Sequence, residues 1–209
     1  MQFLVIEGNI GAGKTTLSEM IASEFNAKLV LEQFADNPFL PKFYEDQERY
    51  SFPLELSFLA DRYKQIKKEI LNPDLFQPFL VADYYFSKTA IFAQNTLQGD
   101  EYLLFRQIFN MVSESMPKPD LYVYLHADVD RLLKNIASRG RDYEKNIKAD
   151  YLSKIEKGYF VFLKQKLPFP VLIIDINKID FVQNTEDYQL LKSAILDQKY
   201  ELGINRLIL

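Results

Sequence analysis

The chain has 209 residues, of which 48% are apolar, and a formal net charge of −4, so it can bury one substantial core and is expected to form a single domain over residues 1–209. It contains no cysteine, which excludes disulfide scaffolds, thiolate zinc sites and cysteine nucleophiles and favours a cytoplasmic location. It has no apolar run of membrane-spanning length, its first residues are strand-like rather than a signal peptide, and it has no long basic block. We therefore expect neither a membrane nor nucleic acid as a partner.

Short extended apolar runs alternate with helical periodicities along the chain. The expected strands are residues 2–6, 28–31, 78–82, 121–126 and 171–175. The expected helices are residues 14–24, 52–71, 86–97, 100–115, 129–138, 149–166 and 187–196. This alternation predicts an α/β fold with a five-stranded parallel sheet covered by helices. The last segment, 200–209, is apolar and basic enough to pack on a partner or on a neighbouring helix, and its sequence does not decide between them.

The most informative motif is residues 8–15, which read GNIGAGKT and satisfy the phosphate-loop pattern. A strand-like run precedes it and an amphipathic helix follows it, so glycine-rich backbone and a helix N-terminus can bind phosphates there. Lys14 would supply positive charge to the terminal phosphates, and Thr15 would offer its hydroxyl to Mg²⁺. The motif predicts ATP or GTP binding with Mg²⁺ as cofactor. The predicted ATP-binding residues are Gly8, Asn9, Ile10, Gly11, Ala12, Gly13, Lys14, Thr15 and Thr16.

Two acidic residues follow predicted strands, Glu32 after 28–31 and Asp83 after 78–82. Ligands bind in the crevice at the carboxyl ends of parallel strands, so both carboxylates are expected beside the phosphate loop. Glu32 can accept the proton of an attacking hydroxyl. Asp83 can hold Mg²⁺ together with Thr15. The alternative for each is an ordinary solvated strand end.

A second basic cluster, Arg139 and Arg141 around a glycine, follows the helix 129–138. With the charged stretch after it, the cluster is typical of a mobile lid, which we place at about 139–149, that closes on the transferring phosphoryl group. Both arginines are therefore candidate catalytic residues that neutralise charge in the transition state. Taken alone, a basic helix end also complements the helix dipole.

These features together resemble the deoxyribonucleoside kinase family. The resemblance rests on residues 6–17, which read IEGNIGAGKTTL, on Glu32 and Arg62, and on FY at 43–44, YSF at 50–52, IFA at 91–93 and RGR at 139–141. It spans residues 1 to about 162. It implies a parallel sheet of five strands, a homodimer, and transfer of the γ-phosphate of ATP to the 5′-hydroxyl of a deoxynucleoside in nucleotide salvage.

The resemblance also implies roles for single residues. Glu32 would be the general base, Tyr44 and Glu144 would hold the sugar 3′-hydroxyl, and Phe92 would stack on the base. Glu55 lies where many relatives carry a base-reading glutamine, with Arg62 beside it. Without the resemblance, Tyr44 and Phe92 would be interpreted as core packing, and Glu55 with Arg62 as a surface ion pair.

The sequence departs from the family pattern at several positions. Relatives commonly carry an arginine directly after the acid of the third strand, whereas residues 83–85 read DYY. Lys88, one helical turn further on, could supply the positive charge, although lysine lacks the bidentate fork of arginine. In the helix before the lid, Asn135 stands where an arginine is common, next to Lys134.

The expected choice of nucleoside base depends on Glu55. An ionised carboxylate only accepts hydrogen bonds, whereas glutamine both donates and accepts. Guanine presents two adjacent donors, so a charged Glu55 favours deoxyguanosine, and a protonated or rotated Glu55 makes deoxyadenosine possible. We therefore expect a purine deoxynucleoside.

Two other readings remain open from the sequence. A nucleoside monophosphate kinase shares the phosphate loop and lid, but it needs arginines near the acceptor, and residues 32–50 contain only Arg49. A GTPase-like switch would use a motif such as NKID at 177–180, but the chain lacks the usual DxxG segment. The single histidine, His126, is expected to be a polar strand end, because one histidine without cysteine cannot form a histidine-cluster metal site.

Overall fold

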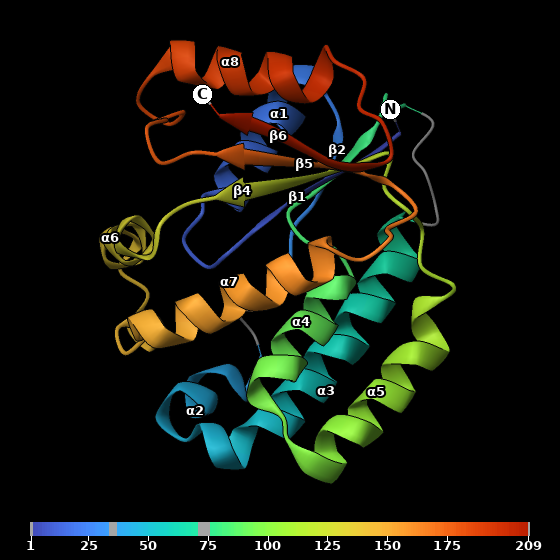
Figure 1. Cartoon of the computed structure of the whole chain (residues 1–209), viewed down its shortest axis with the longest axis vertical. Coiled ribbons are helices and arrows are strands. Elements are labelled where there is room, and N and C mark those ends of the chain that lie inside the picture. Colours follow the sequence, from blue (N-terminus) through green and yellow to red (C-terminus); the bar gives the residue numbers. More distant parts are fainter. Residues whose placement is uncertain (1, 34–36, 71–75, 209) are drawn as a thin grey trace.

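The computed structural model describes residues 2–33, 37–70 and 76–208. Six parallel strands form one sheet in the order β2-β3-β1-β4-β5-β6, with helices on both faces (Figure 1). The strands are β1 (Phe3–Gly8), β2 (Lys28–Val30), β3 (Leu80–Ala82), β4 (Leu121–His126), β5 (Pro170–Asp175) and β6 (Gly203–Ile208). The α/β class and the parallel sheet predicted from the sequence are confirmed, and the number of strands is six rather than five.

The sixth strand corrects the interpretation of segment 200–209. β6 pairs in parallel with β5 along its whole length, from Pro170 opposite Gly203 to Asp175 opposite Ile208. The segment therefore extends the sheet at its edge, and it also contacts a neighbouring helix, because the hydroxyl of Tyr200 donates to the carbonyl oxygen of Ala194 in the last turn of the helix 185–196 at 2.7 Å. The sequence prediction missed the strand because its apolar residues, Ile204, Leu207 and Ile208, do not alternate with polar ones, although exposure does alternate along the strand from Ile204 to Ile208.

Helices cover the two faces of the sheet. They are α1 (Lys14–Phe25), α2 (Leu40–Glu45), α3 (Gln47–Gln65), α4 (Ser87–Thr96), α5 (Gly99–Ser113), α6 (Val129–Arg139), α7 (Ala149–Leu163) and α8 (Thr185–Leu196). One core cluster joins the sheet to α1, α6 and α8, and a second joins it to α3, α4, α5 and α7 (Figure 1). Among the described residues, no helix is both long and apolar enough to cross a membrane.

The helix expected at 52–71 begins earlier than the sequence indicated. α3 starts at Gln47, because the side chain of Asp46 accepts a hydrogen bond from the backbone N–H of Arg49 and caps the helix. Pro53 lies inside it, although proline favours the first helical turn. After α3 the chain continues as a π-helical turn, Ile66–Ile70, and residue 71 of the expected helix lies outside the described residues.

The short helix α2 was not expected from the sequence. With α3 it encloses a small apolar cluster of Leu40, Phe43, Leu54 and Phe58. This cluster lies below the carboxyl ends of the strands and forms one wall of the cleft described next.

Candidate active site

The phosphate loop connects β1 to α1 in the curled backbone that anion binding requires. Gly11 and Gly13 both have φ of +84°, a left-handed conformation that glycine adopts without strain. A Cβ atom at Gly11 would lie 2.8 Å from the carbonyl oxygen of Leu132, and one at Gly13 would lie 2.8 Å from Cζ of Phe181. Larger residues are therefore excluded at both positions, which keeps the backbone N–H groups accessible to phosphate.

Lys14 lies at the start of α1 within the loop. Its ammonium donates a hydrogen bond to the carbonyl oxygen of Asn9 at 2.9 Å. Burial and the positive charge of Lys88 lower the pKa of Lys14 to about 8, and the carboxylates of Glu7 and Asp83 oppose that change. A bound polyphosphate would add negative charge beside this ammonium and stabilise its protonated form.

Thr15 and Asp83 lie side by side at the ends of α1 and β3. The hydroxyl of Thr15 donates to Oδ2 of Asp83 at 2.6 Å, and Oδ1 of Asp83 accepts the backbone N–H of Glu32 at 2.8 Å. A hydroxyl and a carboxylate are hard oxygen donors, and Mg²⁺ is usually held by one or two such groups together with substrate phosphates. The residues present therefore fit the cofactor that the phosphate loop predicts.

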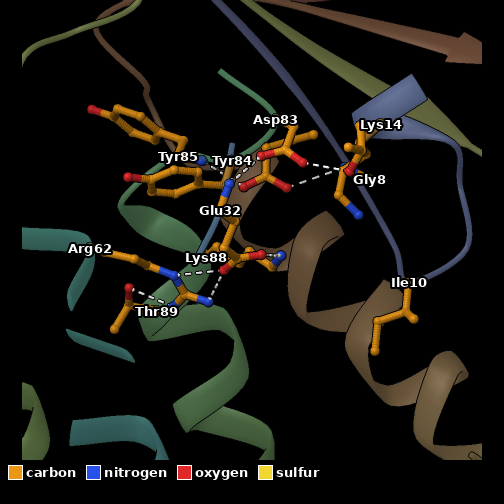
Figure 2. A network of polar contacts seen from close by, with 12 residues as sticks. Gly8, Ile10, Lys14, Glu32, Arg62, Asp83, Tyr84, Tyr85, Lys88 and Thr89 are labelled. Carbon is orange, nitrogen blue, oxygen red and sulfur yellow. Dashed lines mark hydrogen bonds and ion pairs between the residues drawn. The ribbon is translucent and has the colours of Figure 1, made fainter. Parts of the chain in front are cut away.

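Glu32 is a buried carboxylate held by two cations (Figure 2). Nε and Nη2 of Arg62 lie 2.9 and 2.5 Å from its Oε1, and Nζ of Lys88 lies 2.5 Å from its Oε2. Burial raises the pKa of Glu32, but the charges and hydrogen bonds of Lys88 and Arg62 outweigh burial and bring the pKa down to about 2. The carboxylate is therefore ionised and available as a proton acceptor, and its two cations hold its basicity low.

Lys88 brings a positive charge to the cleft, where the sequence lacks an arginine directly after Asp83. The residue directly after Asp83 is Tyr84, whose hydroxyl donates to Oε1 of Gln65, away from Glu32. Lys88 enters from the first turn of α4, is 7% exposed, and contacts Glu32 directly. The sequence indicated this substitution, and the structure places the ammonium within contact of the predicted base.

A further buried acid, Glu7, was not singled out from the sequence. Its carboxylate accepts the backbone N–H of Tyr85 and the hydroxyl of Tyr159, each at 2.9 Å. Burial raises its pKa, and the charges of Lys88 and Lys14 oppose that effect. Glu7 thereby connects β1 to the segment after β3 and to α7. Only its position within the motif before Gly8 could have indicated it.

The cleft beside the phosphate loop is partly open to solvent. It brings together most of the residues predicted from the sequence. Those that line it are Ile10, Gly11, Lys14, Thr15, Glu32, Tyr44, Glu55, Arg62, Asp83, Phe92, Arg139, Arg141 and Glu144. The other predicted ATP-binding residues do not line the cleft: Gly8 ends β1, Asn9, Ala12 and Gly13 lie in the loop, and Thr16 lies in the first turn of α1.

Glu55 lies on the face of α3 that forms the cleft wall, and it is 2% exposed. The hydroxyl of Thr96 donates to its Oε1 at 2.9 Å. The surface ion pair between Glu55 and Arg62 that the sequence allowed is not formed, because Arg62 is buried and directs its guanidinium to Glu32 and to the hydroxyl of Thr89. Burial raises the pKa of Glu55 to about 7, against the positive charge of Arg62 and the hydrogen bond from Thr96. Thr96 has no motif around it that could have revealed this role.

The two arginines after α6 meet the acid predicted to hold the sugar. Arg139 makes a two-nitrogen contact with Glu144, with Nη2 2.7 Å from Oε1 and Nε 3.2 Å from Oε2. Nη1 of Arg141 lies 3.4 Å from Oε1 of the same carboxylate. Glu144 is buried, whereas the arginine side chains are about one third exposed, at 34% and 31%. The cluster therefore carries positive charge over the open side of the cleft.

Aromatic side chains surround the predicted acceptor position. Tyr44 stacks on Tyr143 with ring centroids 6.2 Å apart, and burial raises the pKa of its hydroxyl. Phe92 meets Tyr159 edge-on at 6.5 Å and lies 5.5 Å from Nζ of Lys88. Both rings line the cleft, so neither is confined to core packing.

Polar residues set aside in the sequence have structural contacts. Oδ1 of Asn177 accepts the backbone N–H of Asp128 at 2.9 Å, and Oδ1 of Asp180 accepts that of Gln183 at 3.1 Å. His126 ends β4, with Nε2 3.0 Å from Oε1 of Glu156. Asn135, which replaces a common arginine, donates to the carbonyl oxygen of Gly11 at 2.8 Å. The NKID segment therefore joins loops of the protein through its side chains.

Comparisons with known proteins show which family this chain is similar to. A sequence model of the deoxynucleoside kinase family matches residues 4–199. The deoxyguanosine kinase of Bacillus subtilis (strain 168) is 37% identical over 201 residues, which cover 92% of this chain and 95% of that protein. The deoxyguanosine kinase of Lactobacillus acidophilus is 31% identical over 221 residues, covering 97% and 93%.

A solved structure shares the fold. The deoxyadenosine kinase from M. mycoides with bound dATP superposes with a TM-score of 0.81 at 24% identity, over 95% of this chain and 100% of that one. The family match decides against the monophosphate kinase and the GTPase-like switch that the sequence left open. The chain belongs to the deoxynucleoside kinase family, whose members are ATP-dependent phosphotransferases.

Proposed function

We propose that this kinase transfers the γ-phosphate of ATP to the 5′-hydroxyl of a purine deoxynucleoside in nucleotide salvage, with Mg²⁺ as cofactor. The observation that carries the proposal is the position of Glu32. This ionised carboxylate is buried in the same cleft as Lys14 and Thr15, and Arg62 and Lys88 hold it there. A hydroxyl that attacks a phosphate needs a proton acceptor at this place.

The phosphate side of the reaction uses the loop and its neighbours. Backbone N–H groups of residues 8–16 and the ammonium of Lys14 would bind the phosphates of ATP. Thr15 and Asp83 would hold Mg²⁺, which neutralises charge on the phosphates when it is bound. Thr15 and Asp83 already lie 2.6 Å apart, so little rearrangement is required.

Glu32 would accept the proton of the 5′-hydroxyl. Its pKa of about 2 makes it a weak base while Lys88 and Arg62 both contact it. Lys88 has a flexible side chain with a compact positive charge near Lys14. A bound phosphate would compete with Glu32 for the ammonium of Lys88. If Lys88 turns toward the phosphate, Glu32 loses a positive neighbour and becomes a stronger base when the acceptor is in place.

The cluster of Arg139, Arg141 and Glu144 would act as a lid over about 139–149. The arginines would stabilise charge on the transferring phosphoryl group, and Glu144 with Tyr44 would hold the 3′-hydroxyl of the sugar. The contact between Arg139 and the buried carboxylate of Glu144 supports this arrangement, because it connects the phosphate-facing and sugar-facing residues of the segment.

The base would lie between Phe92 and Glu55. Phe92 offers a ring for stacking, and Glu55 offers a carboxylate whose Oε2 has no hydrogen-bond partner among the described residues. A charged Glu55 accepts the two adjacent donors of guanine, which favours deoxyguanosine, and deoxyadenosine is the second candidate. Relatives named for each of these substrates support a purine.

The protein is proposed to be a single-domain, cytoplasmic homodimer. The absence of cysteine supports a reducing compartment. Leu103, Leu104 and Met111 on α5 are 60%, 47% and 74% exposed, an apolar surface of the kind that a second copy would cover. Measurement of the molar mass in solution by light scattering tests the dimer.

The experiment that tests the activity is a panel of acceptors with Mg²⁺-ATP. Deoxyguanosine, deoxyadenosine, deoxycytidine, thymidine and their 5′-monophosphates are offered separately, and ADP formation is followed. We expect turnover with the purine deoxynucleosides and none with the monophosphates. Turnover with the monophosphates alone would refute the proposed acceptor site.

A further inference from the structure

The contacts of Thr96 differ from those of an ordinary hydroxyl at a helix end. Its Oγ1 lies 2.9 Å from Oε1 of Glu55 and 3.0 Å from the backbone carbonyl oxygen of Phe92. Both partners are hydrogen-bond acceptors when Glu55 is ionised, but a hydroxyl carries one proton. Thr96 therefore donates to one of them at a time, and its contact with Glu55 depends on where the protons are.

With Glu55 ionised, Thr96 donates to Oε1. With Glu55 neutral, two arrangements keep the same heavy-atom positions. In one, Thr96 still donates to Oε1 and the acid proton is on Oε2. In the other, Oε1 donates to Thr96, which donates to the carbonyl oxygen of Phe92. Thr96 can thus hold the carboxyl group of Glu55 in one orientation in both charge states.

The second oxygen of Glu55 is the atom left for a ligand. Oε2 is buried without a hydrogen-bond partner among the residues described, although buried polar atoms are normally satisfied. Glu55 lines the cleft, and Arg62 directs its guanidinium to Glu32 and Thr89. A nucleobase in the cleft is therefore the group that can satisfy Oε2.

The surroundings of Glu55 place its titration near neutral pH. Burial raises its pKa to about 7, which the positive charge of Arg62 and the hydrogen bond from Thr96 limit. The ionisable groups that face it come from five segments of the chain. They are Arg62 on α3, Lys88 on α4, Glu32 after β2, Tyr44 on α2 and Tyr151 on α7.

We infer that Thr96 is a specificity-determining positioning residue that holds the carboxyl group of Glu55 toward the base. The ionised form of Glu55 accepts the two donors of guanine. The neutral form of Glu55 donates to N1 of adenine and accepts from its amino group. This inference rests on the proposed function and deepens it. One cleft then presents two hydrogen-bonding patterns, and the choice between deoxyguanosine and deoxyadenosine follows the protonation of Glu55.

The test is the ratio of kcat/KM for deoxyguanosine to that for deoxyadenosine as a function of pH. Each kcat/KM is proportional to the fraction of free enzyme in the form that binds that substrate, so the ratio should rise by about tenfold per pH unit between about pH 6 and about pH 8. Titrations of Lys14, Glu32 and ATP affect both substrates alike and cancel in the ratio. Neither base changes its own protonation state in this range.

Three variants separate positioning from a general structural role. Glu55→Gln should make the ratio independent of pH. Thr96→Val removes the hydroxyl at nearly constant volume, so the pKa of Glu55 rises and the ratio should fall about tenfold at each pH. Thr96→Ser keeps the hydroxyl and should leave the ratio within about twofold of the parent value.

Several results would overturn the inference while the proposed kinase activity remains. They are a parent ratio that changes less than about twofold over the range, a Glu55→Gln variant that keeps the slope, or a Thr96→Val variant that matches the parent. Failure to phosphorylate any deoxynucleoside at any pH would refute the proposed function and this inference with it.

Discussion

Lys88 places its ammonium nitrogen 2.5 Å from Oε2 of Glu32, and both side chains are more than nine-tenths buried. The pair joins the first turn of α4 to a residue two positions after the end of β2, and both side chains line the cleft beside the phosphate loop. A buried carboxylate held by a lysine and an arginine is ionised but weakly basic. Its strength as a base therefore depends on where Lys88 points.

Replacement of Lys88 by methionine should lower kcat/KM by about a hundredfold, because positive charge near the transferring phosphate is lost. The same change should move the acidic limb of the pH profile to higher pH, since Lys88 is a cation that lowers the pKa of Glu32. Steady-state kinetics over a pH series measures both effects. Lys88→Arg keeps the charge, so its acidic limb should lie at the same pH as that of the parent. A Lys88→Met variant whose acidic limb also lies at the pH of the parent would contradict this account.

Glu55→Gln should stabilise the protein at alkaline pH. The pKa of Glu55 is about 7 when folded and 4.5 in its reference state. Between these values the unfolded chain binds fewer protons than the folded chain, so the stability contribution of Glu55 falls as pH rises and is fully lost above about pH 7. The variant should gain up to about 3 kcal/mol in the free energy of unfolding at pH 8 and little at pH 4.

Urea unfolding of the parent and of Glu55→Gln at both pH values measures this difference. Titrations shared by the two proteins cancel. Glu19→Gln on the exposed side of α1 is the matched control and should show the same difference at both pH values. An equal effect of Glu55→Gln at the two pH values would contradict the burial of an ionisable Glu55.

Gly13→Ala should destabilise the protein more than Gly140→Ala. Both glycines have positive φ, +84° and +69°, so both variants bear a backbone cost of about 1 kcal/mol. At Gly13 the new Cβ would also lie 2.8 Å from Cζ of Phe181, whereas at Gly140 no atom lies within 4 Å of it. Overpacking adds roughly 1–3 kcal/mol. Equal midpoints of thermal unfolding for the two variants would show that Phe181 moves aside freely.

Glu144→Gln should weaken binding of the deoxynucleoside and leave ATP binding unchanged. We expect KM for deoxyguanosine to rise about tenfold, because the carboxylate proposed to accept the 3′-hydroxyl is lost. The control is a substrate without that hydroxyl, 2′,3′-dideoxyguanosine. For this substrate the variant and the parent should have similar KM values. An equal loss on both substrates would mean that Glu144 acts only by orienting Arg139.

The parts of the site that follow from the sequence are those defined by local pattern or by topology. The glycine pattern of residues 8–15 predicts the backbone geometry of the phosphate loop. A parallel sheet brings Glu32 and Asp83 to the edge formed by the carboxyl ends of its strands, whatever the order of the strands. The family resemblance added Tyr44, Phe92 and Glu144, all of which line the cleft. Local sequence patterns and the order of strands can be recognised without knowledge of how side chains pack.

The parts that the sequence did not show depend on packing between distant segments. Lys88 and Glu32 are 56 positions apart, and Thr96 and Glu55 are 41 apart. No local pattern encodes these contacts, because the first forms only when α4 lies beside the segment after β2, and the second only when α3 and α4 pack together. Strand β6 was missed because its apolar residues do not alternate with polar ones in the sequence, as they do in a typical half-buried strand.

The role of Glu32 is tested most directly by the Glu32→Gln variant with deoxyguanosine and Mg²⁺-ATP. ATP binding is measured by titration calorimetry, and thermal unfolding checks that the variant is folded. The account predicts that kcat falls by about 10²- to 10⁴-fold while the Kd for ATP changes by less than about threefold, because the variant loses the proton acceptor and keeps the phosphate loop. A folded variant that retains kcat within about threefold of the parent would contradict the assignment of Glu32 as the base.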